Sequence, residues 1–312
     1  MRKIHLKCLN FGLYHAIIRK VTSFGLQEDI KMKIGFIGAG KVGYSLGRYF
    51  AENGLFLTGY YSRDIQSSME AAKFTGSKGY EEISELVSDS DVIFITVPDG
   101  SIIEVYDKVK QVGIAGKQIC HCSGAMSASE AFHDLSEYGA SGCSIHPLFP
   151  VSSKYDSFRE LHKAFFCIEG DEANVKIWSD IFEKFGNRTR VISGEDKCEY
   201  HAACSISSNL VCALVAKSLS IFEKCGFTES EAKTALEPLI MSNIRRVLAV
   251  GPVDALTGPV ERNDVDTVLK HIRCMGNEVD RNMYMAVSRK LVDIAEKKHP
   301  DSDYEELKRL LK

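Results

Sequence analysis

Three glycines, Gly38, Gly40 and Gly43, follow a short apolar run in the stretch "MKIGFIGAGKVG" that begins at Met32. Their spacing, G-x-G-x-x-G, is typical of a strand-to-helix turn that holds the pyrophosphate of a dinucleotide. The first glycine allows the tight turn, the second lets the backbone approach the phosphates, and the third lets the helix pack against the strand. An ordinary glycine turn of another α/β fold is the alternative. The residues predicted to hold the pyrophosphate are Gly38, Ala39, Gly40, Lys41, Val42 and Gly43.

The next predicted strand, in "LFLTGYYSRD" (55–64), bears on which nicotinamide nucleotide binds. An enzyme that uses NAD would place an Asp or Glu about 20 residues past the glycines, bonded to the ribose hydroxyls. Ser62 and Arg63 occupy that region, and both side chains can bind a 2′-phosphate. Asp64 follows them and is a candidate N-cap for the next helix. We therefore predict NADP, with NAD and a solvated Arg63 as the alternative.

A second group of side chains with chemical potential lies in the apolar stretch 195–226. Lys197, His201, Ser205 and the pair Ser208/Asn209 recur every three to four residues, so they form one polar stripe on a predicted helix. If the stripe is buried, it needs partners. A lysine ammonium can stabilise negative charge on a carbonyl oxygen and give it a proton, and desolvation would lower the pKa of Lys197. Each residue also has a non-catalytic alternative. Lys197 would then be a surface charge exposed to solvent, and His201 would be an interior histidine whose nitrogens are hydrogen-bonded within the protein.

Further candidates lie where predicted strands end, because ligands of an open parallel sheet bind beyond the carboxyl ends of its strands. Ser123 ends one strand and is predicted to bind a carboxamide or a carboxylate, unless it is a helix N-cap. His146 precedes Pro147, which either aims it at the cleft or is purely structural. The strand predicted at 92–97 ends in Val97, Pro98 and Asp99, and these residues are predicted to face the cofactor.

The loop "ALTGPVERND" (255–264) carries the last candidates. Thr257, Arg262 and Asp264 are predicted to close the cleft over the substrate. Arg262 suits a substrate carboxylate, because a guanidinium pairs with it through two charged donors. Asp264 has the alternative of capping the next helix.

These residues need a scaffold, and the sequence between residues 32 and 194 indicates one. Short apolar strands such as "VIFITV" (92–97) alternate with helical stretches. After Gly194 no strand pattern recurs, and residues 195–226 are predicted to form one long helix that ends at Gly226. We predict an α/β fold: a Rossmann-type, doubly wound, mostly parallel sheet over 32–194, followed by an all-helical substrate and dimerisation domain over 195–312.

Composition narrows the class of protein. The net charge of −3 gives no electrostatic reason to expect binding to nucleic acid or to a membrane surface. The 10 cysteines lack metal-ligand spacing, so we predict no metal, and free thiols favour a reducing cytoplasm. The 195–226 stretch is apolar, but His201, Asn209 and Lys217 favour a buried helix over a membrane span.

Residues 1–31 differ from the rest of the chain. They carry no acidic residue up to Gln27, yet a transit peptide would be richer in serine. Since Met32 directly begins the first predicted strand, we expect translation to start there. On that interpretation the preceding segment is a dispensable upstream extension.

Six motifs carry a resemblance to a known family, in the order "GFIGAGKVG", "VPDGSI", "HCSGAMSA", "SIHPL", "DKCEYHAACSISSN" and "ALTGPVERND". Over about residues 32–290 the chain resembles Rossmann-like proteins whose C-terminal helical domain was long of unknown function. That group is similar to ketopantoate reductases, pyrroline-5-carboxylate reductases and β-hydroxyacid dehydrogenases. One departure is the loop motif, commonly R-G-D, which here is Arg262-Asn263-Asp264.

The resemblance implies roles for the polar stripe, because related dehydrogenases use a helix lysine beside the substrate carbonyl with an amide nearby. It implies Lys197 as the acid, Asn209 as a donor to the substrate and His201 as the alternative acid. The leading hypothesis is NADPH-dependent reduction of a small keto acid, with 2-dehydropantoate as the named substrate. The alternatives are an imine (C=N) reductase of the pyrroline-5-carboxylate type and a nucleotide-binding protein without turnover. Related enzymes pair their subunits through long apolar helices, so we expect a homodimer.

Overall fold

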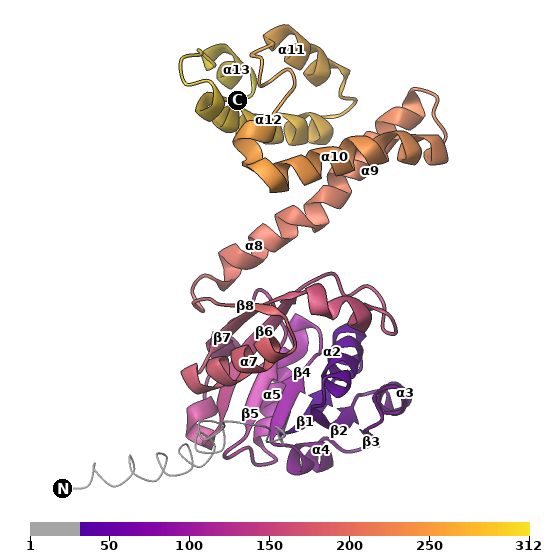
Figure 1. Cartoon of the computed structure of the whole chain (residues 1–312), viewed down its shortest axis with the longest axis vertical. Helices are drawn as coiled ribbons and strands as arrows, with labels where there is room; N and C mark the ends of the chain where they lie inside the picture. Colours follow the sequence, from indigo (N-terminus) through magenta and orange to yellow (C-terminus); the bar gives the residue numbers. More distant parts are fainter. Residues whose placement is uncertain (1–31) are drawn as a thin grey trace, which may run out of the picture. The chain divides into compact units, whose positions relative to one another are not determined.

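The computed structural model describes residues 32–312 (Figure 1). The expectation for residues 1–31 therefore concerns a segment outside the described residues. The chain divides into two compact units, of which the first ends at Ile206 and the second runs from Ser207 to Lys312. The predicted domain boundary between residues 194 and 195 stays a prediction.

A single sheet organises the first unit. Within residues 32–312 it has eight strands in the order β3-β2-β1-β4-β5-β6-β7-β8, and only the β6–β7 pair is antiparallel. The order 3-2-1-4-5-6 is that of a doubly wound dinucleotide-binding sheet, so the predicted fold class is confirmed. The strands are β1 (Lys33–Ile37), β2 (Phe56–Tyr61), β3 (Lys78–Tyr80), β4 (Val92–Ile95), β5 (Gln118–His121), β6 (Ser141–Leu148), β7 (Phe165–Gly170) and β8 (Arg188–Val191).

Helices cover both faces of this sheet (Figure 1). Successive side chains of a strand point to opposite faces, so Phe94 of β4 packs with one layer and Ile93 with the other. On one face Phe94 meets Trp178 edge-on at 5.0 Å between ring centroids. On the other face Ile93 packs in a cluster with Tyr106. The helices are α2 (Lys41–Glu52), α3 (Ile65–Thr75), α4 (Ile83–Asp89), α5 (Ile102–Lys110), α6 (Ala128–Ala131) and α7 (Glu172–Lys184), with 3₁₀ turns η1 (Asp99–Ser101), η2 (Leu135–Tyr138) and η3 (Ser157–Lys163).

The stretch predicted as one long helix forms two, α8 (Lys197–Ser207) and α9 (Asn209–Lys224). Ser208 between them has φ −125° and ψ −72°, which is not helical. The prediction of an unbroken helix is therefore wrong. At this break the Ser208 hydroxyl donates a hydrogen bond to Oδ1 of Asn209 at 3.1 Å. The predicted end is correct, since Gly226 has φ +91° just past α9.

The second unit is helical within the described part of the chain. After α9 come α10 (Glu229–Ala255), α11 (Val265–Cys274), α12 (Glu278–Lys298) and α13 (Glu305–Leu310). Thr228 and Glu231 form a capping box at the start of α10. Gly251, at φ +84°, interrupts α10 before Pro252. A core that includes Val268 joins α11, α12 and α13.

By length and composition alone, the stretch Lys197–Lys224 could cross a membrane. The prediction of a buried helix is wrong for the single chain, because the most apolar part of this stretch is not buried and α9 contains no buried residue. Two of its lysines nevertheless have partners in the protein. Lys197 is buried in the first unit, and Lys217 forms an ion pair with Asp280 inside the second. Apolar side chains of α9 such as Leu210 remain exposed in the single chain.

Candidate functional site

The glycine motif forms the turn between β1 and α2. Gly38 has φ +106°, and a Cβ on it would lie 2.7 Å from the carbonyl oxygen of Thr96. A Cβ on Gly43 would lie 2.4 Å from the carbonyl oxygen of Gly38, so glycine is needed for α2 to pack this closely. At Gly40 the nearest atom to such a Cβ would be 4.0 Å away. The backbone at Gly40 therefore borders open space, where a pyrophosphate fits.

The start of α2 also suits an anion. Gly40 is its N-cap and supplies no side-chain hydrogen bond, and the first turn holds no acidic residue. The first N–H groups of a helix lack intrahelical acceptors and lie at the positive end of its dipole, so a diphosphate satisfies both. Lys41 adds an exposed positive charge there, while Ala39 is buried and Val42 half-buried beside the turn.

The end of β2 presents Ser62 and Arg63. Asp64 caps α3 as predicted, because its carboxylate accepts hydrogen bonds from the N–H of Gln66 at 3.3 Å and of Ser67 at 3.2 Å. The hydrogen bond from the Ser67 hydroxyl, with the helix N–H groups, lowers the pKa of Asp64. Arg63 is exposed, and residues 32–312 give its guanidinium no hydrogen-bond or ion-pair partner. This end of β2 therefore offers a cation rather than a carboxylate.

The end of β4 lies beside the glycine turn. β1 and β4 are parallel neighbours, and the Thr96 hydroxyl donates a hydrogen bond to the carbonyl oxygen of Gly38 at 2.8 Å. Beyond Thr96, Val97 is half-buried, whereas Pro98 and Asp99 are exposed. These predicted cofactor-facing residues thus lie at the same edge of the sheet as the glycines.

Ser123 connects the ends of β5 and β4. Its hydroxyl donates a hydrogen bond to Oδ2 of Asp99 at 2.7 Å and accepts from the N–H groups of Ala125 and Met126 at 3.2 and 3.0 Å. The N-cap of α6 is Ser127 instead. The N-cap alternative for Ser123 is therefore wrong, and its hydroxyl holds the turn at the strand ends.

Lys197 is 1% exposed, so the solvated-charge alternative is wrong. Its Nζ donates hydrogen bonds to the carbonyl oxygen of Ser123 at 2.8 Å and to the Ser144 hydroxyl at 2.5 Å. Burial lowers the pKa of Lys197, and the nearby carboxylate of Glu169 opposes that effect. The carboxylate of Glu169 itself accepts from the N–H of Ala128 at 2.8 Å. Lys197 thus places a buried positive charge beneath the turn at Ser123.

A histidine pair lies beside the same turn. His146 Nδ1 and the hydroxyl of Tyr200 are 2.7 Å apart, and the rings of His146 and His201 are 6.2 Å apart between centroids. A Cβ on Gly124 would lie 2.6 Å from Cδ2 of His201 and 3.0 Å from Nε2 of His146. Burial, followed by the charge of Lys197 and then of His201, lowers the pKa of His146 to about 4. His146 is therefore neutral near pH 7.

Sequence reasoning missed Tyr200, Ser144 and Gly124. Tyr200 could have been found from the sequence, because it lies between Lys197 and His201 in the motif "DKCEYHAACSISSN". Ser144 had none, because nothing in the sequence shows which hydroxyl a buried lysine meets. His201, whose alternative was an interior histidine, is exposed at its helix surface.

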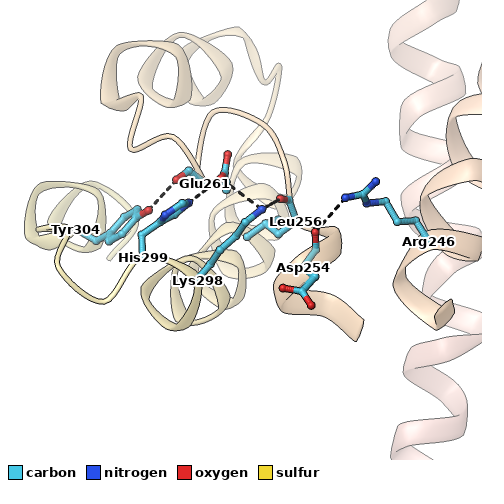
Figure 2. A network of polar contacts seen from close by, with 7 residues as sticks. All are labelled: Arg246, Asp254, Leu256, Glu261, Lys298, His299 and Tyr304. Carbon is cyan, nitrogen blue, oxygen red and sulfur yellow. Dashed lines mark hydrogen bonds and ion pairs between the residues drawn. The ribbon is translucent and has the colours of Figure 1, made fainter. Parts of the chain in front are cut away.

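The loop 256–264 in the second unit is held to α12 and α13 by a polar network (Figure 2). Glu261 Oε1 is 2.7 Å from Nε2 of His299, and Lys298 Nζ donates a hydrogen bond to the carbonyl oxygen of Leu256 at 2.7 Å. The Tyr304 hydroxyl donates to the carbonyl oxygen of Glu261, also at 2.7 Å. Both ends of the loop are therefore fixed.

That loop explains the departure from R-G-D. Asn263 has φ +56°, the left-handed region that glycine adopts freely and asparagine tolerates. Asp264 caps α11 by accepting from the N–H of Thr267 at 3.0 Å, which is its predicted alternative role. The substrate roles of Thr257 and Arg262 stay predictions, as does that of Asn209, which is exposed at the start of α9.

Two sequence-family models match the chain. A Rossmann-like domain matches residues 20–147, and a domain of unknown function (DUF2520) matches residues 164–291. The chain therefore contains both of these domains, in this order. The second match includes β7 and β8, so it contributes two strands to the shared sheet as well as most of the helical unit. No curated protein matches the chain.

Solved structures share the fold over most of the chain. A "putative NADP oxidoreductase" from Bacteroides fragilis is 18% identical, with a TM-score of 0.69 over 84% of this chain and 98% of its own. Protein TM1727 from Thermotoga maritima is 27% identical, with a TM-score of 0.67 over 85% and 99%. A variant imine reductase from Myxococcus stipitatus, in complex with NAD+, is 21% identical, with a TM-score of 0.58 over 91% and 100%. Pyrroline-5-carboxylate reductases also match, at 14% to 16% identity. The chain thus has the fold of NAD(P)-dependent oxidoreductases.

Proposed function

We propose that the chain is an NADPH-dependent oxidoreductase that reduces the carbonyl group of a small keto acid, with 2-dehydropantoate as the first substrate to test. One observation carries the choice of a carbonyl. The buried ammonium of Lys197 lies beneath the strand-end turn at Ser123, next to a histidine whose pKa it helps to lower. A fixed positive charge in a buried site favours reactions that develop negative charge.

In this proposal the cofactor lies along the edge of the sheet where β1, β2 and β4 end. The turn from Gly38 to Gly43 and the first N–H groups of α2 hold its diphosphate. Ser62 and Arg63 hold its 2′-phosphate. When bound, NADPH supplies the hydride for the substrate carbon.

In this proposal Lys197 acts in two ways. Its positive charge acts electrostatically on the substrate, and its ammonium fixes the backbone of Ser123. Its ammonium already donates to the Ser123 carbonyl oxygen and to Ser144, so it is not a free proton donor. A carbonyl oxygen gains negative charge as the carbon is reduced, and the buried cation lowers the free energy of that state. The same field disfavours an iminium substrate, which is positively charged.

His146 is the proposed hydrogen-bond donor that stabilises the developing oxyanion through its Nε2–H, and water supplies the proton of the product hydroxyl. Burial raises the pKa of Tyr200, so its phenol stays protonated and can donate to Nδ1 of His146. In that tautomer the imidazole proton is on Nε2, beside Gly124 and the strand-end turn. Tyr200 is then a positioning residue.

The test is a substrate panel that follows NADPH consumption by the purified full chain. 2-Dehydropantoate, other 2-keto acids and cyclic imines such as 1-pyrroline-5-carboxylate are compared. We expect turnover of a keto acid, and a loss in kcat of about 10²-fold or more in His146→Asn with NADPH binding retained. Turnover of imines alone, or full activity in His146→Asn, would refute the keto-acid proposal.

An imine reductase is the second candidate, because the full engagement of Lys197 leaves no free ammonium and an activated imine needs less acid help. Lys197→Ala separates the possibilities. It should abolish most turnover of a keto acid and cause no comparable loss of imine turnover, because an iminium is already positively charged. It would have no catalytic consequence in a nucleotide-binding protein without turnover.

We also propose a homodimer of a cytoplasmic protein that binds neither nucleic acid nor membrane. Exposed apolar side chains on α9 and α10 support a protein partner, since patches of this kind usually mark interfaces. Light scattering should show a dimer for the native chain and a monomer for the double variant Leu239→Glu with Leu248→Glu. A native monomer at micromolar concentration would refute this. The exposed apolar side chains of α9 and α10 are Leu210, Leu214, Leu239, Met241, Ile244, Leu248 and Val250.

A further inference from the structure

Lys154 lies in the loop between β6 and η3, and its ammonium is placed against the nucleotide-binding half of the sheet. Nζ lies 4.8 Å from the centroid of the Tyr44 ring, and Tyr44 is buried in the first turn of α2. Lys154 is half-buried, yet over residues 32–312 its ammonium has no hydrogen-bond or ion-pair partner. An unpaired cation in such a position is suited to an anionic ligand.

The loop that carries Lys154 is fixed on both sides of it. The Ser45 hydroxyl donates a hydrogen bond to the carbonyl oxygen of Ser153 at 3.3 Å. The Tyr155 ring meets Tyr44 edge-on at 5.6 Å and Phe74 edge-on at 5.5 Å. These contacts attach the loop to α2 and α3, so Lys154 is held between the two helices.

The charge of Lys154 reaches the end of β2. It contributes, after the Ser67 hydrogen bonds, to the lowered pKa of Asp64, the residue that follows Arg63. Helix α3 connects the two cations, since it begins shortly after Arg63 and its Phe74 meets the Tyr155 ring next to Lys154. Over residues 32–312 neither cation has a hydrogen bond or an ion pair, although the Lys154 ammonium lies over the Tyr44 ring. In a doubly wound fold the adenosine ribose lies there, between the end of the second strand and the first helix of the motif.

We propose that Lys154 is a second cation for the 2′-phosphate of NADP, opposite Arg63 and beside the hydroxyl of Ser62. The proposal rests on the proposed use of NADP. A phosphate bearing close to two negative charges binds two cations better than one, and it supplies the anionic hydrogen-bond acceptor that neither side chain has within residues 32–312. Cofactor selectivity then depends on a loop that follows β6 as well as on the turn after β2.

The experiment is calorimetric titration of the full chain with NADPH, NADH, adenosine 2′,5′-bisphosphate and AMP. Lys154→Met keeps the apolar stem over Tyr44 and removes the charge, and Lys154→Arg restores it. Lys163→Met, at an exposed lysine of η3, is the matched control. We expect Lys154→Met to weaken NADPH and the bisphosphate about tenfold or more, with NADH and AMP changed less than about twofold. Lys154→Arg should retain most of the affinity.

Each contrary outcome has a distinct meaning. Equal weakening of NADPH and NADH in Lys154→Met would indicate a structural role and overturn the inference. An unchanged affinity for NADPH in that variant, with a loss in Arg63→Ala, would overturn the inference and leave NADP use intact. A native chain that binds NADH as tightly as NADPH would refute the proposed cofactor itself.

Discussion

The ammonium of Lys197 on α8 donates a hydrogen bond to the backbone carbonyl oxygen of Ser123 at the end of β5, over 2.8 Å. Two residues predicted to contact cofactor or substrate, Ser123 and Lys197, are thus bonded to each other. The contact gives the lysine a fixed place under the turn, where its charge acts on what binds above. It also means that replacing Lys197 tests an electrostatic role rather than direct proton donation.

Lys197→Met should lower kcat for a keto acid by at least about tenfold and leave the Kd for NADPH unchanged, because the buried charge is lost while the glycine turn is intact. Removing the lysine charge should also raise the pKa of His146, which NMR titration of the imidazole would measure. Lys184→Met, at an exposed lysine of α7, is the control and should change neither. An unaltered His146 pKa would contradict the electrostatic role.

Gly40→Ala should leave the melting temperature nearly unchanged and weaken NADPH binding, since its φ of −81° suits alanine and its Cβ would occupy the pyrophosphate space. Gly38→Ala is the informative contrast, because φ +106° strains any L side chain. That variant should lose more than about 1 kcal/mol of unfolding free energy. Calorimetry with and without NADPH measures the unfolding free energy and the binding of NADPH in each variant. Tight NADPH binding by Gly40→Ala would count against the assignment of Gly40 to the pyrophosphate site.

Arg63→Ala should weaken NADPH binding about tenfold or more and barely change that of NADH, because only NADPH carries the 2′-phosphate. Fluorescence titration of each nucleotide makes the comparison. Arg159→Ala, at another exposed arginine, serves as the control. Equal losses for both nucleotides would point to a general effect on the fold.

Unfolding free energy should fall as the pH drops below about 6.5, in part through His121. Burial, with the Lys197 charge second, lowers the pKa of this fully buried imidazole from 6.5 to about 3. Below pH 6.5 His121 binds a proton in the unfolded chain, whereas in the folded chain it stays neutral. The unfolding free energy therefore decreases by about 1.4 kcal/mol per pH unit until the pH reaches the pKa of His121 in the folded chain. Urea unfolding between pH 4.5 and 7.5 should show a shallower slope in His121→Asn than in the control His162→Asn. Identical slopes would show that His121 does not cause the loss.

Local sequence was sufficient for several features because their causes lie within a few residues. The cap at Asp64, the capping box at Thr228 and the helix end at Gly226 each depend on side chains or dihedral preferences inside one turn. The break at Ser208 was missed, since apolar periodicity continues across it and only the balance of backbone hydrogen bonds differs.

The amino-acid sequence by itself determined the order of strands and helices, the glycine turn and the absence of an acidic residue at positions 60–63, because short-range periodicity and spacing carry that information. Only the tertiary structure decided which strand ends are neighbours and what lies beneath them. Ser123, Ser144 and Lys197 are far apart in the chain, and the parallel pairing of β5 with β6 brings the two serines together. The same holds for Lys154 and Tyr44. Burial, and with it the pKa of Lys197 and His146, results from packing between distant segments, so no local pattern could predict it.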